Sequence, residues 1–106
     1  MSEKLQAILN ELRDKFQALY EERLVQMILY GSQVRGDACQ GSDIDVMIVL
    51  SETVNPGAEI SRTSEIVADI SLKYDEVISC VFMDEDKFTH RNGPLLRNVR
   101  REGISV

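Results

Sequence analysis

Three short runs of apolar and β-branched residues divide the chain: Leu24–Tyr30, Asp43–Leu50 and Val77–Met83. Each run has the length expected of a buried strand. None approaches the roughly 18 to 20 residues that an apolar helix needs to cross a bilayer. Because Met1–Leu12 also lacks the basic and apolar regions of a signal peptide, we expect the protein to act in the cytoplasm.

Helices are predicted before, between and after these strands. Apolar residues at spacings of three and four indicate one amphipathic helix over residues 3–21 and another over 58–74. A short helix is expected after Pro94 and up to Gly103, with an acidic turn at Asp84–Phe88, whose acids Asp84, Glu85 and Asp86 also suit the start of a helix. The order helix, strand, strand, helix, strand, helix is typical of an α/β or α+β sandwich, with a small mixed β-sheet flanked by helices.

Length, charge and cysteine content exclude several classes of protein. A chain of 106 residues can bury one core and not two, so we expect a single domain over residues 1–106. Residues 1–86 hold 17 acidic and 7 basic side chains, whereas residues 87–106 hold five basic and one acidic. The net charge of -6 argues against nonspecific adhesion to nucleic acid, although the tail is basic.

Only Cys39 and Cys80 are present, so no cysteine and histidine metal cage is available, and both are expected to be thiols.

One stretch carries residues suited to phosphate chemistry. It reads Gly31-Ser32-Gln33-Val34-Arg35-Gly36, followed after a loop by Ser42-Asp43-Ile44-Asp45-Val46. Glycine at the end of a buried strand allows a tight turn, and serine at the start of the next helical turn leaves unpaired amides and a hydroxyl facing outward. Such a turn can cradle a phosphate.

The two acids that follow lie on one side of a predicted strand. Asp43 and Asp45 are two residues apart, so their carboxylates project to the same side, with Cα atoms roughly 6 to 7 Å apart. Ile44, Val46 and Ile48 then face the other way. Two acids at the start of an apolar strand repel each other unless a cation or water intervenes. Mg²⁺ suits this position, because it takes oxygen ligands from one or two carboxylates and from substrate phosphates.

These residues resemble a known family. Gly31, Ser32, Asp43 and Asp45 form the pattern Gly-Ser, ten residues, Asp-x-Asp, which is similar to the signature of the minimal nucleotidyltransferases in the DNA polymerase beta-type superfamily. The flanking Arg35-Gly36 and Ser42 add to the match, which covers nearly the whole chain. The resemblance implies the nucleotidyltransferase fold. It also implies a nucleoside triphosphate bound by Gly31, Ser32, Arg35 and Ser42, and Mg²⁺ bound by Asp43 and Asp45. Arg35 could equally be a structural partner of Asp37 or Asp43.

The chemistry implied by the resemblance is transfer of a nucleoside monophosphate to a hydroxyl, with Asp43 and Asp45 as the catalytic residues and pyrophosphate as the leaving group. In that mechanism two metal ions bridge the attacking and leaving oxygens. The family usually adds a third carboxylate from a later strand. Here Ser79 or Cys80 occupies that place, depending on the register of the strand. The nearest carboxylates that could replace it are Asp75, Glu76 and, less favourably, Asp69.

Small members of the family resemble the antitoxin half of two-component systems whose other half is a HEPN-domain protein. By that resemblance, the acceptor is a tyrosine hydroxyl on the HEPN partner and the donor is ATP, with a homodimer possible and no nucleic-acid template. An alternative is a non-catalytic nucleotide-binding module that blocks its partner by occupying its surface, which the missing third carboxylate motivates. A weaker alternative is modification of a small molecule, for which the chain has little surface to spare.

Overall fold

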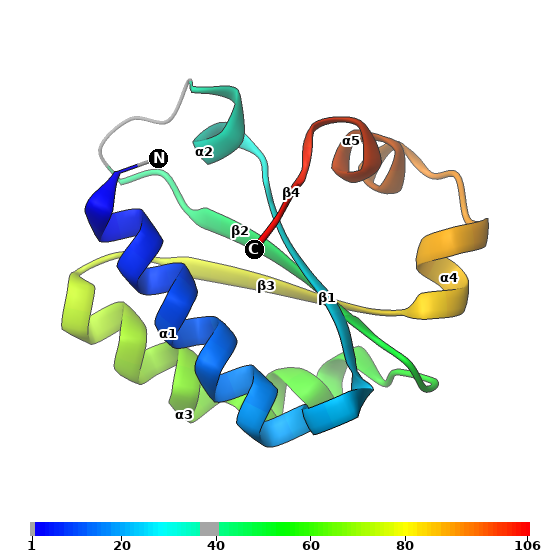
Figure 1. Cartoon of the computed structure of the whole chain (residues 1–106), viewed down its shortest axis with the longest axis horizontal. Helices are drawn as coiled ribbons and strands as arrows, with labels where there is room; N and C mark the ends of the chain where they lie inside the picture. The colour runs from blue at the N-terminus through cyan, green and yellow to red at the C-terminus, as the bar shows by residue number, and fades with distance from the viewer. Residues whose placement is uncertain (1, 37–40) are drawn as a thin grey trace.

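The computed structural model describes residues 2–36 and 41–106. Its centre is a four-stranded sheet in the order β3-β2-β1-β4 (Figure 1). The strands are β1 (Leu24–Tyr30), β2 (Ile44–Leu50), β3 (Ile78–Asp84) and β4 (Ile104–Ser105). Strand β1 pairs antiparallel with β2 and β4, whereas β2 pairs parallel with β3. The mixed sheet predicted from the order of elements is therefore confirmed.

The two longest helices begin at residues whose side chains accept one of the first free N–H groups. The helices of the described residues are α1 (Glu3–Tyr20), α2 (Ser32–Arg35), α3 (Pro56–Tyr74), α4 (Glu85–His90) and α5 (Pro94–Glu102), with a 3-10 turn, η1 (Glu21–Arg23), after α1. The Ser2 hydroxyl accepts the Leu5 N–H at 3.1 Å, and the Asn55 side chain accepts the Ala58 N–H at 3.2 Å. None of the helices in the described ranges is long and apolar enough to cross a membrane.

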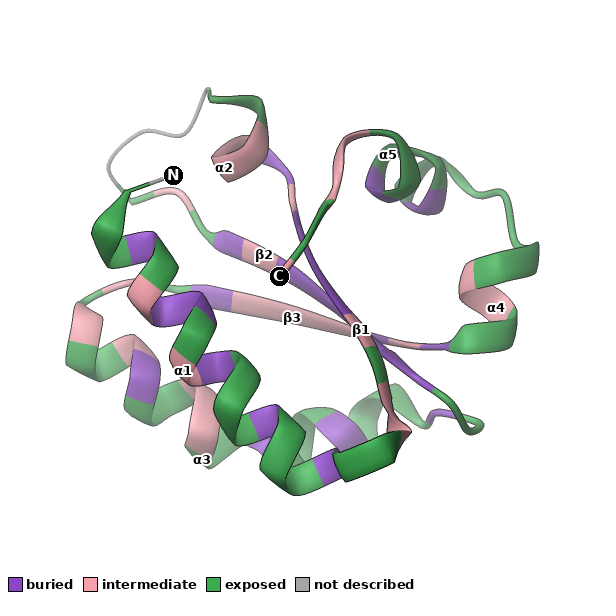
Figure 2. Cartoon of the chain, in the orientation of Figure 1, coloured by how far each residue is buried: buried purple, intermediate pink, exposed green. Residues whose placement is uncertain are grey.

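The sheet carries a hydrophobic cluster on each face. Helices α1 and α3 cover one face, and α5 with α4 covers the other (Figure 1). Ile44, Val46 and Ile48 belong to the cluster under α1 and α3, whereas Met47 and Val49 belong to the cluster under α5. Strand β2 is therefore buried on both faces (Figure 2), which explains its almost continuous apolar sequence.

Two parts of the chain differ from the sequence-based prediction. The acidic segment Asp84–Phe88 is not a turn: Asp84 ends β3, and its carboxylate accepts the Lys87 N–H at 2.8 Å to begin α4. Strand β4 has only two residues and was not predicted. It lies beside β1, where the Val106 N–H donates to the Met27 carbonyl at 2.9 Å. A pairing this short depends on a distant partner strand, so no local periodicity reveals it.

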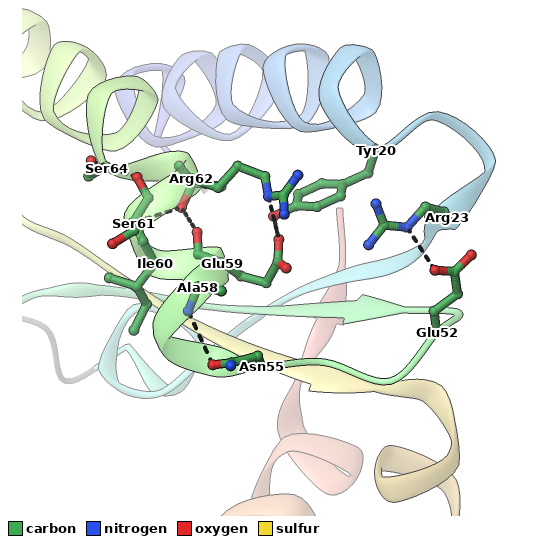
Figure 3. Close-up of polar contacts among 11 residues, drawn as sticks. Tyr20, Arg23, Glu52, Asn55, Ala58, Glu59, Ile60, Ser61, Arg62 and Ser64 are labelled. Carbon is green, nitrogen blue, oxygen red and sulfur yellow. Dashed lines mark hydrogen bonds and ion pairs between the residues drawn. The ribbon is translucent and has the colours of Figure 1, made fainter.

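A buried polar contact joins α1 to α3. The Tyr20 hydroxyl donates to Glu59 Oε1 at 2.6 Å, and Arg62 lies 3.2 Å from the same oxygen (Figure 3). Burial and this hydrogen bond raise the pKa of Tyr20 well above its usual range. Because Glu59 is only 6% exposed, its carboxylate depends on these two partners.

We expect Tyr20→Phe to lower the free energy of unfolding by about 1 to 2 kcal/mol, because it removes one donor from the buried Glu59 carboxylate. Tyr74→Phe is the matched control, since Tyr74 is only half-buried and the neighbouring Glu11 raises the pKa of its hydroxyl. We expect that variant to change stability by less than about 0.5 kcal/mol. Urea unfolding of the three proteins measures the difference, and equal losses would contradict the role given to Tyr20.

Candidate functional site

Three polar side chains lie in one row across the sheet, near the start of β2. Asp45 is paired with Tyr30 on β1 and with Ser79 on β3. Paired residues on neighbouring strands share a face of the sheet. This face is the one covered farther along by α5, opposite the face to which Ile44 and Val46 belong. All three residues of the row are half-buried, and Tyr30 packs against the cluster under α5.

Gly31 approaches the Asp45 carboxylate closely. Its φ of +81° with ψ of -152° is a conformation open in practice to glycine alone. A Cβ added at Gly31 would lie 2.6 Å from Asp45 Oδ2, well inside contact distance. Residue 31 must therefore be glycine both for the turn and for the space that it leaves beside Asp45.

The electrostatics of this corner disfavour a second negative charge. Burial raises the pKa of Asp45, and the nearby Asp43 carboxylate raises it further, whereas Arg35 acts in the opposite direction. Burial and the Asp45 charge also raise the pKa of Tyr30. Asp43 itself is exposed, just before β2 begins. A cation bound between the two carboxylates would relieve their repulsion.

Helix α2 is a single turn that begins directly after Gly31. The N–H groups of Val34 and Arg35 both donate to the Gly31 carbonyl at 3.1 Å, so these two N–H groups are hydrogen-bonded within the turn. The Arg35 guanidinium lies 3.2 Å from Glu102 Oε1 at the end of α5. Of the two structural partners that the sequence suggested for Arg35, Asp37 lies outside the described residues, as does Cys39.

The register of β3 decides which residue stands beside Asp45. Ser79 is the partner of Asp45, whereas Cys80 is the partner of Val46 and packs against the cluster under α1 and α3. Burial raises the pKa of the Cys80 thiol to about 12, so it stays protonated near neutral pH. Ser79 therefore occupies the position beside Asp45 at which the family resemblance leads us to expect a third carboxylate.

The other three acids that the sequence offers lie elsewhere in the fold. Glu76 pairs with Lys4 at 2.8 Å, and Asp75 is exposed at the left-handed end of α3. Asp69 lines a groove between α1 and α3. In the parts of the chain that the structure describes, no three histidine, cysteine or acidic side chains lie close enough to hold a metal ion by themselves. Asp43 and Asp45 remain as a pair of neighbouring carboxylates, the type of oxygen donor that hard divalent cations prefer.

Two neighbours of this site were not found from the sequence. Tyr30 carries a local signal, since it ends β1 immediately before Gly31 and so must lie near the turn. Glu102 carries none, because its contact with Arg35 joins residues 67 positions apart.

Comparison with known proteins points to one family. The sequence profile described as the nucleotidyltransferase domain matches residues 6–99. Methanocaldococcus jannaschii MJ0604, which carries the name of a protein adenylyltransferase, is 31% identical over 100 residues, covering 93% of this chain and 90% of its own length.

Solved structures share the fold at lower identity. A crystal structure of a toxin-antitoxin with AMP-PNP superposes with a TM-score of 0.62 at 21% identity, covering 91% of this chain and 71% of the matched chain. A structure of the tri-AMPylated Shewanella oneidensis HEPN toxin in complex with MNT antitoxin gives a TM-score of 0.54 at 15% identity, covering 92% and 70%.

Proposed function

The chain belongs to the nucleotidyltransferase domain family and is a nucleotidyltransferase, and on this premise we propose that it transfers AMP from ATP to a hydroxyl on a protein partner. The observation that carries the proposal is the fit of Gly31 against the Asp45 carboxylate, with Asp43 two residues earlier. Burial and the neighbouring Asp43 both oppose ionisation of the Asp45 carboxylate, so this turn does not stabilise the fold. An acid held in such a position is typical of a functional site.

On the nucleotide side, we assign binding of the triphosphate to Gly31, Ser32, Arg35 and Ser42. Gly31 and Ser32 form the turn at the start of α2, and Arg35 ends the same turn. The guanidinium of Arg35 suits a phosphate, because its planar donors match pairs of phosphate oxygens. The influence of Arg35 on the pKa of Asp45 supports its closeness to this site.

The carboxylate pair fits a hard divalent cation, and we propose Mg²⁺ held by Asp43 and Asp45. When bound there, such an ion supplies neutralisation of the charge that develops on the phosphate oxygens. The residues of the chain would then orient the reactants: the oxygen of the acceptor hydroxyl forms a bond to the α-phosphorus, the bond from that phosphorus to the pyrophosphate oxygen breaks, and the hydroxyl proton passes to solvent water. Ser79 supplies no carboxylate to accept this proton.

Metal binding has a readout that does not require turnover. The raised pKa of Asp45 means that its contribution to stability is present below its unfolded value near 4 and is lost as pH rises through the folded value. At pH 7 the ionised Asp45 carboxylate therefore lowers the stability, and we expect Mg²⁺ to raise the melting temperature by a few degrees. The increase should disappear in a variant with Asp43→Asn and Asp45→Asn. An equal increase in both proteins would contradict the assigned ligands.

We further propose that the partner is a HEPN-domain toxin, that a tyrosine hydroxyl is the acceptor, and that the chain acts as the antitoxin in the cytoplasm, where ATP is available. Two neighbours support this proposal: MJ0604 by its adenylyltransferase name, and the Shewanella oneidensis complex by its AMPylated HEPN toxin. A homodimer within such a complex is part of the same proposal.

The test mixes the purified protein, Mg²⁺, ATP labelled on the α-phosphate and the proposed partner, which is sought as a HEPN protein encoded by a neighbouring gene. Label is expected on the HEPN protein with the wild type and not with the Asp43→Ala, Asp45→Ala double variant. Absence of label, with a stable complex retained, would overturn transfer. That result would favour a second function, a non-catalytic module that neutralises its partner by binding, for which Ser79 opposite Asp45 is the specific observation.

Adding the missing acid is a direct test of the register. We expect Ser79→Asp to raise the rate of AMP transfer by about tenfold or more, because it places a proton acceptor beside Asp45. Cys80→Asp is the matched control, since it puts the same acid on the opposite, apolar face. That variant should lose about 2 to 4 kcal/mol of stability without any gain in rate. A gain from Cys80→Asp alone would show that the register differs.

A further inference from the structure

We propose that the outer edge of β3, together with the groove between β3 and α3, binds the acceptor segment of the partner protein as an added β-strand. This inference rests on the proposed function and specifies how the acceptor is presented. The segment would be extended, with apolar side chains on one face, the acceptor hydroxyl on the other and basic residues at its ends. Four features of the described residues support it.

The first feature is the edge itself. Strand β3 ends the sheet on the side away from β4, and within residues 2–36 and 41–106 no strand pairs with its outer side. The Ile44 N–H donates to the Val77 carbonyl at 2.8 Å, which fixes the phase of the ladder with β2. Since the backbone groups of successive residues point to opposite sides, Ile78, Cys80 and Phe82 direct theirs outward. The edge also lacks the lysine, proline or bulge that usually prevents strand addition.

The second feature is an apolar groove beside this edge. It has a volume of about 380 Å³ and is lined on the strand by Ile78, Cys80 and Phe82 and on the helix by Ile60, Val67 and Ala68. The lining residues of β3 belong to the face turned toward α3. A strand added at the edge would direct every second side chain into the groove, which is how strand addition obtains specificity.

The third feature is the charge at both ends of the strand. Asp75 precedes β3, and Glu85 and Asp86 follow it, whereas Glu76 and Asp84 are paired with Lys4 and Lys87. A second copy added antiparallel would bring the acidic start of one strand beside the acidic end of the other. This repulsion disfavours a homodimer through β3 and favours a segment with lysine or arginine at its ends.

The fourth feature is the path from the edge to Asp45. An added strand would lie two strand spacings from β2, roughly 9 to 10 Å away. Its residue opposite Ser79 would share the face of Asp45, with only the short serine side chain between them. Tyrosine is the longest of the side chains that carry a hydroxyl, so it can extend across Ser79 toward Asp45, whereas serine and threonine are too short.

The experiment measures docking without ATP or Mg²⁺, so that its failure and a failure of AMP transfer are distinguishable. The probe is the synthetic peptide Lys-Arg-Val-Tyr-Val-Thr-Val-Arg-Lys, added to the full ¹⁵N-labelled protein. We expect amide hydrogen exchange at Ile78, Cys80 and Phe82 to slow by about tenfold or more, with little change at Ser79 and Val81, which already face β2. A peptide with glutamate in place of its basic residues should bind about tenfold more weakly, less so at high salt.

Two exposed serines of α3 give matched variants. Ser64 lines the groove and Ser61 does not. We expect Ser64→Trp to weaken peptide binding by about tenfold and Ser61→Trp to leave it unchanged. Lack of binding at about 1 mM peptide, binding without slower exchange at the outward amides, or equal effects of the two variants would overturn the proposal. Protection of the same amides that depends on protein concentration alone would assign the edge to a second copy and would overturn it as well.

Discussion

Asp45→Asn is expected to reduce transfer of AMP to the partner by at least about 10³-fold, because it removes the half-buried charge on which the proposed cation and phosphate alignment depend. The same substitution should raise the melting temperature of the metal-free protein at pH 7, since it removes a carboxylate whose ionisation is opposed by burial and by Asp43. A loss of activity with a gain in stability identifies a residue that is kept for chemistry.

The measurement is label transfer from ATP, with thermal unfolding recorded on the same samples. Asp69→Asn is the matched control, because it changes the charge equally on α3, in a groove away from the paired aspartates. It should retain nearly full activity. An Asp45→Asn protein that transfers label within threefold of the wild-type rate would remove Asp45 from the mechanism.

Gly31→Ala should produce the second large effect. The new Cβ would lie 2.6 Å from Asp45 Oδ2, and the backbone would have to hold alanine at a φ of +81° and a ψ of -152°. We expect a loss of about 1 to 3 kcal/mol in the free energy of unfolding. AMP transfer should fall by about 10²-fold or more, because a displaced carboxylate no longer meets the substrate in the required geometry.

Gly36→Ala separates strain from displacement. Gly36 has the same φ of +81°, but no heavy atom of residues 2–36 or 41–106 lies within 4 Å of an added Cβ. It should therefore lose about 1 kcal/mol of stability and keep its activity. If the two variants lost activity in parallel, backbone strain rather than the contact with Asp45 would explain the effect of Gly31.

The parts of the fold that were predictable from the sequence are those with a strong local pattern. Strand β2 is apolar on both faces, and α1 places an apolar residue at nearly every third or fourth position, so both elements were predicted to within one or two residues. The spacing from Gly31 to Asp45 is likewise a pattern within one short stretch of sequence, which is recognisable without any tertiary contact. The sequence alone therefore indicated the nucleotidyltransferase family, and the family comparison confirmed it.

The parts that were not predictable depend on contacts between distant segments. Ser79 and Cys80 are neighbours in sequence, and only the pairing of β3 with β2 assigns Ser79 to the face of Asp45. The acidic segment after Met83 forms a helix of only six residues, too few to show helical periodicity, so its sequence fits a turn as well as the start of a helix. Strand β4 exists only because α5 returns the chain to β1, where a Cβ on Gly103 would meet Ile28 and the Val99 carbonyl.

In the proposed nucleotide site, the Glu102 carboxylate competes with the phosphates of the nucleotide for the Arg35 guanidinium. If Arg35 receives the triphosphate, then binding exchanges one anion for another on the same guanidinium instead of filling an empty position. The free energy of nucleotide binding then includes the loss of the ion pair between Arg35 and Glu102. Release of the Glu102 carboxylate couples nucleotide binding to the end of α5. A partner that binds Glu102 and separates it from Arg35 would increase the affinity for nucleotide. By reciprocity, bound nucleotide would increase the affinity of that partner for α5.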